Sequence, residues 1–215
     1  MTVNANKLKL SFLLLISLVP IVAATLYFRW SLESGSNGTT SKGVLISPVL
    51  DLARLELRDE DGEPAYLTFE EMTAGVDPED YEPRPWQVLF VTSAECRDAC
   101  VERLYMLRQM HLRLASEATR VQRALVLVDG KGAKIPQTTL DVLAEQQPDL
   151  RLLNGDAATL KRELAPSAAG RDLIEENFIY LADPVGNIML YFTPENTVDE
   201  IFRDIDKLLE QSGLG

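Results

Sequence analysis

The sequence is poor in the residues that carry most catalytic and metal chemistry. Its 215 residues include two cysteines and one histidine, and its 21 lysines and arginines are outnumbered by 33 aspartates and glutamates. Two cysteines are too few for a disulfide scaffold, and one histidine leaves no credible Ser/His/Asp catalytic set. The net charge of −12 argues against nucleic acid as a partner, because a phosphate backbone attracts cationic proteins.

The N-terminal region lacks acidic residues altogether. The run from Leu10 to Trp30 carries a single charge, Arg29, and two lysines precede it. About 20 apolar residues are enough to cross a bilayer as a helix, and positive residues before such a run place the N-terminus in the cytoplasm. The sequence therefore predicts a cytoplasmic N-terminus over 1–9 and a single-pass transmembrane anchor over 10–30. Small residues at 22–24 leave a cleaved signal peptide as the alternative.

The rest of the chain consists of a polar segment and one domain. Residues 31–43 are small and polar, which predicts a flexible tether, and residues 44–215 are enough to bury a core of their own. Beyond the first thirty residues, 18 basic residues face 33 acidic ones. This excess of acidic residues is compatible with a cationic partner, although most acidic surfaces only maintain solubility. The predicted orientation puts the domain in the bacterial periplasm or an equivalent space.

Hydrophobic periodicity predicts alternating strands and helices in this domain. Strands are expected at 86–92, 121–128, 150–153, 178–182 and 188–192, and helices at 96–118, 138–146, 156–164 and 196–211. A hairpin is expected over 55–69, with loops over 73–85 and 129–136. The order of strand, helix, strand, helix, hairpin and terminal helix is typical of a thioredoxin-like α/β fold, in which helices flank a central mixed sheet.

Both cysteines, Cys96 and Cys100, fall where the first of these strands meets its helix. A helix N-terminus stabilises a thiolate, so reactive cysteines are often found there. Three interpretations remain open: a disulfide, a metal clamp, and two small packed residues. Residues four apart on a formed helix have Cβ atoms too far apart for a disulfide, so Cys96 is expected in the loop before the helix. The same loop would let both sulfurs reach one copper(I) ion, which favours thiolates.

Several features together resemble one known family. They are the N-terminal anchor, the C-x-x-x-C pair after the strand 86–92, and the segment I-Y-L-A-D-P-V-G-N at 179–187. In combination they resemble the Sco/SenC family, membrane-anchored proteins of cytochrome c oxidase assembly. The resemblance implies copper bound through the two cysteines and a later histidine, or thiol-disulfide reductase activity. It also implies a respiratory oxidase subunit or another assembly factor as partner, at the bacterial inner membrane.

The chain departs from the family pattern at the copper ligands. Arg97 and Val101 stand where proline usually follows each cysteine. No histidine precedes Tyr180, and counting back from it reaches Glu175 or Glu176. A carboxylate is a hard ligand that suits copper(I) poorly, so Glu175 is only a weak third candidate beside the cysteines. Copper binding is therefore expected to be weaker than in the family, or absent.

The single histidine cannot easily replace the missing ligand. His111 lies 11 residues after Cys100 in the predicted helix, about 16 Å along its axis. Ligands must converge on a metal at bond lengths of about 2 Å, so we expect His111 to be a core or partner-facing residue.

The sequence thus predicts a membrane-anchored, periplasmic Sco-like assembly factor for a respiratory heme-copper oxidase. Cys96 and Cys100 would bind copper transiently or exchange disulfides with a partner. A second hypothesis is a copper-independent thiol-disulfide oxidoreductase in which Cys96 attacks and Cys100 resolves. A third is a redox-inert module that keeps the fold and only holds a partner.

Overall fold

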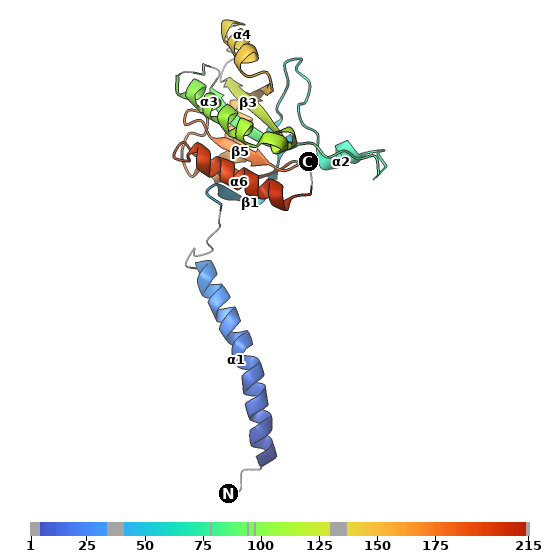
Figure 1. Ribbon diagram of the computed structural model, residues 1–215, viewed down its shortest axis with the longest axis vertical. Coiled ribbons are helices and arrows are strands. Elements are labelled where there is room, and N and C mark those ends of the chain that lie inside the picture. The colour runs from blue at the N-terminus through green and yellow to red at the C-terminus, as the bar shows by residue number, and fades with distance from the viewer. Residues whose placement is uncertain are drawn as a thin grey trace. The chain divides into compact units, whose positions relative to one another are not determined.

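The chain forms two compact units, Met1–Ser41 and Lys42–Gly215. A computed structural model describes residues 5–33, 41–77, 79–93, 95–96, 98–129 and 137–213 (Figure 1). The tether predicted over 31–43 and the loop predicted over 129–136 lie largely outside the described residues.

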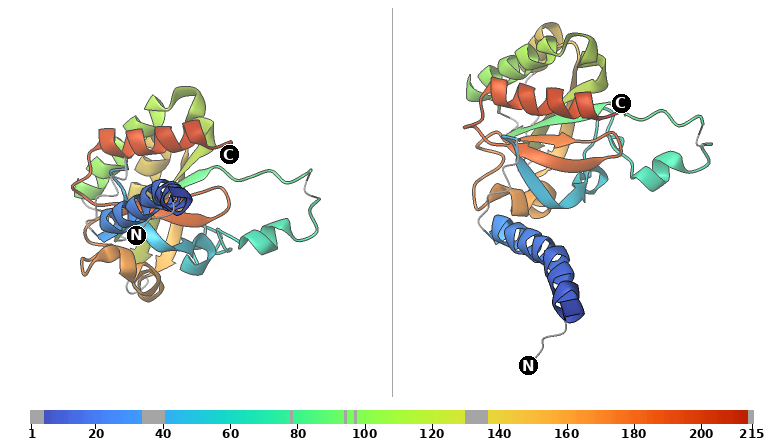
Figure 2. Two further views of the ribbon diagram at one scale, coloured as in Figure 1. Left: turned by 90° about the horizontal axis from the view of Figure 1, so that it is seen from below. Right: turned by 60° about the horizontal axis from the view of Figure 1, so that its bottom comes forward.

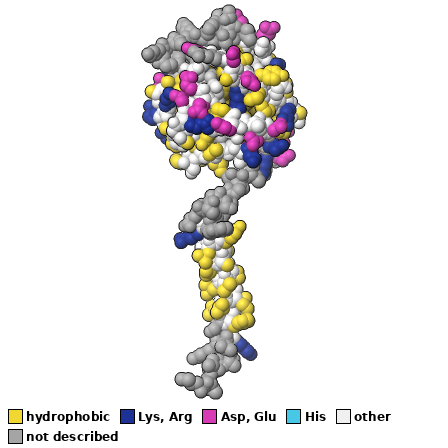
Figure 3. Space-filling model, turned by 90° about the vertical axis from the view of Figure 1, so that its left-hand side faces the viewer, with side chains coloured by type: hydrophobic (Ala, Val, Ile, Leu, Met, Phe, Trp, Pro, Cys, Tyr) yellow, Lys and Arg dark blue, Asp and Glu magenta, His cyan; other side chains and the backbone are white. Residues whose placement is uncertain are grey.

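The first unit contains one long helix, α1 (Ala5–Glu33), which includes Pro20. The segment 10–30, predicted as a transmembrane anchor, is helical throughout. The apolar side chains described along it are exposed, between 49% at Val22 and 69% at Tyr27 (Figure 3). In the part of the chain that the structure describes, no helix combines the length and the apolar character that a membrane crossing needs.

A six-stranded mixed sheet forms the centre of the second unit (Figure 2). Its strands are β1 (Val44–Asp51), β2 (Trp86–Ser93), β3 (Val121–Asp129), β4 (Leu150–Asp156), β5 (Ile179–Ala182) and β6 (Asn187–Phe192), in the order β1-β6-β5-β2-β3-β4. Strand β3 runs parallel to β2 and β4, whereas β5 runs antiparallel to β2 and β6. Strand β2 is central and buried from Trp86 to Thr92, as the apolar run at 86–92 predicts.

Helices cover both faces of the sheet, and each face has its own hydrophobic cluster. One face carries α3 (Asp98–Arg113), α4 (Gln137–Gln146) and α6 (Val198–Gln211), and the other carries α5 (Ala157–Ala168) and the 3₁₀ helix η1 (Leu52–Leu55) (Figure 2). Side chains of β2 alternate between the two clusters: Val88 and Phe90 join the first, and Leu89 and Val91 the second. The predicted α/β arrangement of helices around a mixed sheet is confirmed.

The helix predicted over 96–118 is shorter and is broken near its end. Helix α3 ends at Arg113, because Ala115 takes a positive φ of 51°, and a 3₁₀ helix, η2 (Ala115–Arg120), follows. The apolar period continues through both helices, which is why the pattern alone does not show the break.

The hairpin predicted over 55–69 is confirmed only next to its turn. Arg58 and Pro64 form an antiparallel bridge, the Ala65 N–H donates to the Leu57 carbonyl oxygen at 2.8 Å, and no strand longer than this bridge is present among the residues described there. The segment ends instead in a short helix, α2 (Phe69–Thr73). Thr68 and Glu71 form a capping box, with the Thr68 N–H donating to the Glu71 carboxylate at 2.9 Å, and this box starts the helix.

Candidate functional site

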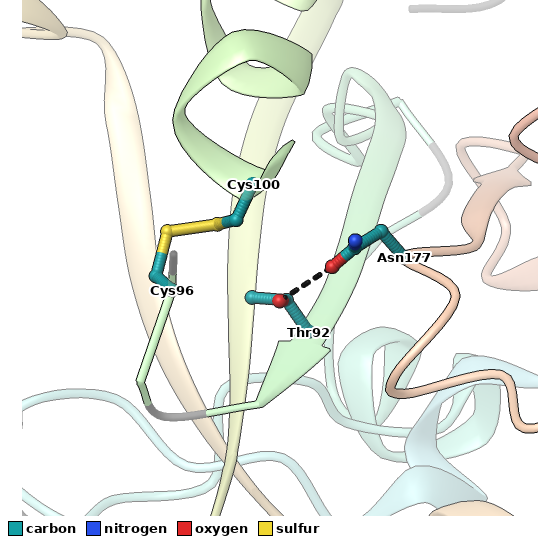
Figure 4. The surroundings of a disulfide bond; sticks show 4 residues. All are labelled: Thr92, Cys96, Cys100 and Asn177. Atoms are coloured by element: carbon teal, nitrogen blue, oxygen red, sulfur yellow. Dashed lines mark hydrogen bonds between the residues drawn. A yellow bond between two sulfur atoms is a disulfide. The ribbon is translucent and has the colours of Figure 1, made fainter. Parts of the chain in front are cut away.

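The two cysteines form a disulfide at the junction of β2 and α3 (Figure 4). Their Cα atoms are 5.2 Å apart, within the usual range for a disulfide. Cys96 lies two residues before the first residue of α3, and Cys100 lies in the first turn. The prediction that Cys96 sits in the loop rather than in the helix is therefore confirmed.

The backbone at Cys96 takes an unusual conformation. Its φ is +28°, and its N–H donates to the Ser93 carbonyl oxygen at 3.1 Å, which closes a tight turn after β2. A residue with a side chain rarely adopts a positive φ, and such positions cost of order 1–3 kcal/mol. The disulfide and the positive φ therefore occur at the same residue.

The two sulfur-bearing residues differ in their access to solvent. Cys100 is 2% exposed and Cys96 is 8% exposed, and both pack into the hydrophobic cluster beneath α3. Cys96 also lines a groove of about 850 Å³ between α3 and α4, whereas Cys100 does not. An incoming thiol would therefore meet Cys96 first, which fits the predicted roles of Cys96 as the attacking thiol and Cys100 as the resolving thiol.

Charges of both signs act near the cysteine pair. The N-terminus of α3 contributes a positive dipole end, which favours a thiolate. Asp98 and Glu102 are exposed on the first two turns of α3 and line the same groove as Cys96, so their negative charges act in the opposite direction. Among the described residues, the helix N-terminus therefore promotes thiolate formation, and Asp98 and Glu102 oppose it.

A hydrogen bond beside the disulfide joins β2 to the segment before β5 (Figure 4). The Thr92 hydroxyl donates to Asn177 Oδ1 at 2.7 Å, and the Val91 N–H donates to the Phe178 carbonyl oxygen at 2.9 Å. Thr92 is 2% exposed, and Asn177 has a φ of +59°, which asparagine tolerates better than most residues. These contacts fix the end of β2 from which the cysteine loop departs.

The predicted third copper ligand does not join the cysteines in a recognisable metal site. Glu175 is exposed, and Glu176 forms an ion pair with Arg171, which also pairs with Glu195. Among the residues that the structure describes, no group of three or more His, Cys, Asp or Glu side chains is arranged to hold a metal. The thiol pair is the only part of the predicted ligand set that comes together.

The His111 side chain forms hydrogen bonds with the backbone of the segment that follows α3. It is half-buried, and its Nε2–H donates to the carbonyl oxygens of Ala118 and Val121, both at 2.9 Å. Both partners only accept, so this nitrogen carries the proton. His111 thus holds the end of α3 against η2 and the start of β3.

A buried arginine on α3 forms hydrogen bonds with the connection between β6 and α6. Arg103 is 6% exposed and lies one turn after Cys100. Its guanidinium donates to the carbonyl oxygens of Thr193, at 2.7 Å, and Asn196, at 3.0 Å. Burial lowers the pKa of Arg103, and the Glu195 charge partly offsets this effect. The contacts anchor the helix on which Cys100 sits, and the sequence pattern gives no sign of them.

A family profile described as transmembrane-like, thioredoxin-like, C-terminal domain matches residues 86–212, which is more than half of the chain. The chain belongs to this family. The match begins at the first residue of β2 and ends just after α6, so it includes the disulfide and the sheet strands β2 to β6. No curated protein matches the chain by sequence.

Solved structures of Sco proteins share the fold at low sequence identity. Yeast Sco1 superposes with a TM-score of 0.54 at 15% identity, over 81% of this chain and 100% of that one. Copper-bound Arabidopsis thaliana ScoI gives 0.52 at 17% identity, over 80% and 100%. BsSco, a member of the Sco family of cytochrome c oxidase assembly proteins with a disulfide switch, gives 0.51 at 16% identity, over 79% and 99%. These similarities establish a thioredoxin-like, Sco-like fold.

Proposed function

We propose that this protein exchanges disulfides with a partner through Cys96 and Cys100. The observation that carries the proposal is the disulfide at the β2–α3 junction, in which only Cys96 lines an open groove. The helix N-terminus behind the pair stabilises the thiolate that either direction of exchange requires.

The exchange proceeds in two steps that transfer two electrons. A thiolate of the partner attacks the Cys96 sulfur, a mixed disulfide forms, and Cys100 leaves as a thiolate. A second thiolate of the partner then attacks its own sulfur in the mixed disulfide and releases Cys96. The partner ends as a disulfide and the Cys96–Cys100 pair as a dithiol, and the same steps in reverse reduce a partner disulfide.

The proposed setting is the assembly of a respiratory heme-copper oxidase in the bacterial periplasm. Support comes from the Sco-like fold and from BsSco, an oxidase assembly protein described as having a disulfide switch. A respiratory oxidase subunit or another assembly factor would then be the partner. A strain that carries Cys96→Ser and Cys100→Ser should lose assembled oxidase, measured by its absorption spectrum in membranes. Normal oxidase in that strain would count against this setting.

We further propose that α1 attaches the domain to the inner membrane. Support comes from the exposed apolar side chains of α1 and from the single charge, Arg29, between Leu10 and Trp30. Alkaline carbonate should leave the full chain in the membrane pellet, and protease added to spheroplasts should digest the domain. Release of the chain by carbonate would contradict attachment through α1.

The exchange proposal is tested first by the redox equilibrium of the thiol pair. Full-length protein is equilibrated with mixtures of reduced and oxidised glutathione, and the fraction of the Cys96–Cys100 disulfide is measured by alkylation and mass spectrometry. A potential well below about −300 mV marks a disulfide that resists reduction and would refute exchange. With Cys100→Ser, a mixed disulfide to Cys96 should accumulate, whereas Cys96→Ser should form little of it.

Transient copper(I) binding by the reduced pair is the second candidate. The observation that favours it is the placement of two soft sulfur ligands together in a fold shared with copper-bound ScoI. Among the described residues no His, Asp or Glu side chain joins the two sulfurs in a group that could hold a metal, so we expect such a site to depend on the two thiolates. Anaerobic titration of the reduced protein against a chromogenic chelator, with Cys96→Ser as control, tests this: equal binding by both proteins would exclude it.

A further inference from the structure

The groove beside Cys96 has the features of a recognition surface for the partner in disulfide exchange. It lies between α3 and α4, encloses about 850 Å³, and contains the more exposed of the two cysteines. Its walls include Val101 and Tyr105, whose side chains are 52% and 59% exposed on α3. Large apolar side chains left in water next to a reactive sulfur are typical of a surface that a partner covers.

The charges of the groove indicate which kind of partner fits. Asp98 and Glu102 line it near Cys96, and Arg108 lines it two turns further along α3. A segment that places its cysteine at Cys96 would therefore bring its neighbouring residues against two acids. A basic residue near the partner's cysteine gains from this charge, whereas an acidic residue is repelled.

The net charge of the whole domain indicates which other molecules would bind the groove poorly. Beyond residue 30 the chain carries 18 basic and 33 acidic residues, so a second copy would meet strong repulsion at long range. The anionic tripeptide glutathione would also meet the acids at the groove. A cationic partner is instead attracted, which speeds its encounter with the groove.

We infer that the α3–α4 groove binds a cysteine-bearing segment of a partner protein that carries apolar and basic residues beside its cysteine. This inference rests on the proposed exchange and adds its substrate class. Tyr105 and Val101 contact the apolar residue of that segment, Glu102 and Asp98 face its basic residue, and Cys96 forms the mixed disulfide with its thiol. The two thiols of the segment lose two electrons and two protons, and the Cys96–Cys100 disulfide takes them up to become a dithiol.

The test measures the reduction of the oxidised full chain in detergent by three dithiols. They are a short peptide with leucine and lysine beside its two cysteines, the same peptide with glutamate in place of lysine, and dithiothreitol. We expect the lysine peptide to react faster than the glutamate peptide by about fivefold or more, since each exposed charge contact contributes modestly.

Matched variants locate this preference in the groove. Tyr105→Ser should slow both peptides by about fivefold, because an interface aromatic contributes more than most residues. Glu102→Lys should remove or invert the preference for lysine. The controls are Leu112→Ser, on the same helix and also 59% exposed but outside the groove, and Glu210→Lys on α6. Neither control should change the peptide rates, and dithiothreitol should react alike with all variants.

The outcomes separate this inference from the function on which it rests. Equal rates for both peptides in all variants, with normal reduction by dithiothreitol, would overturn the groove inference and leave exchange standing. A disulfide that resists dithiothreitol as well as both peptides would overturn the exchange function and the groove inference with it. Slowing by Leu112→Ser as large as that by Tyr105→Ser would show that general surface hydrophobicity, not the groove, sets the rate.

Discussion

Reduction of the Cys96–Cys100 disulfide should change the stability of the folded domain very little. The bond closes a loop with a sequence separation of only 4. Loop-closure entropy for so short a loop amounts to about 2 kcal/mol of the free energy of unfolding. Taken alone, this contribution would lower the melting temperature on reduction by about 4–8 °C for a domain of this size.

The conformational cost of the backbone at Cys96 offsets this contribution to the free energy of unfolding. Its φ of +28° is held while the sulfur is tied to Cys100, and a conformation of this kind costs about 1–3 kcal/mol. Cleavage of the bond lets residue 96 return to a negative φ and releases this cost in the reduced protein. The two contributions then cancel to within about 1 kcal/mol, so the melting temperature should move by less than about 4 °C.

Thermal unfolding followed by circular dichroism measures this difference directly. The full chain is compared in detergent as the oxidised protein and after reduction with a phosphine, which does not form mixed disulfides. The Cys96→Ser/Cys100→Ser double variant is the control, and its melting temperature should not respond to the reductant. A fall of about 4–8 °C in the natural chain would show the full loop-closure contribution and refute the release of backbone strain. The disulfide would then be mainly structural.

Two further predictions concern the rest of the domain. Asp204 is 5% exposed and accepts the N–H groups of Lys42 and Gly43, both at 2.7 Å, so Asp204→Ala leaves two amides without this partner. This substitution should lower the free energy of unfolding, measured with urea, by about 3 kcal/mol. A decrease of less than about 1 kcal/mol would show that water replaces the carboxylate as the acceptor. Hydrogen bonds from Arg171 lower the pKa of Glu195 from 4.5 to about 2, so its contribution to stability is complete above pH 4.5 and disappears as the pH falls toward 2. An NMR titration of the Glu195 carboxyl checks this, and an ordinary pKa would contradict the pairing seen here.

The sequence shows the elements around the cysteines because those elements have clear periods. The apolar run at 86–92 became β2, and the apolar stripe after Cys96 became α3. Strand β1 is harder to recognise, because none of its eight residues is fully buried and the residues around Pro48 show no regular alternation of buried and exposed positions. Helix α2 has only five residues, too few for a helical period, and only its capping box marks it.

The site itself depends on contacts between residues far apart in the chain. Thr92 and Asn177 are 85 positions apart, and Arg103 reaches carbonyl groups about 90 positions away. Single-sequence patterns report on neighbours within one element, so they cannot place these pairs together. The positive φ at Cys96 cannot be predicted from the sequence either, because cysteine has no preference for that conformation.

The amide at Asn177 offers the sharpest distinction between thiol exchange and copper binding. It lies beside the disulfide, in the segment before β5, and its oxygen accepts the Thr92 hydroxyl (Figure 4). An amide oxygen is a poor ligand for copper(I), whereas an imidazole binds copper well. Histidine also tolerates a positive φ better than most residues, so Asn177→His should fold with its side chain beside the cysteines.

If the thiol pair is placed to hold copper, this substitution should complete the site. The reduced Asn177→His protein should bind copper(I) more tightly than the natural chain by at least about tenfold, or about 1.4 kcal/mol. The matched control is Glu175→His, which puts the same side chain at an exposed position two residues earlier and should gain nothing. Anaerobic competition with a chromogenic chelator measures both. Equal, measurable affinities for all three proteins would show that residue 177 does not reach the sulfurs and that the two thiolates alone hold the copper. No binding by any of the three would leave disulfide exchange as the chemistry that the cysteine pair can perform.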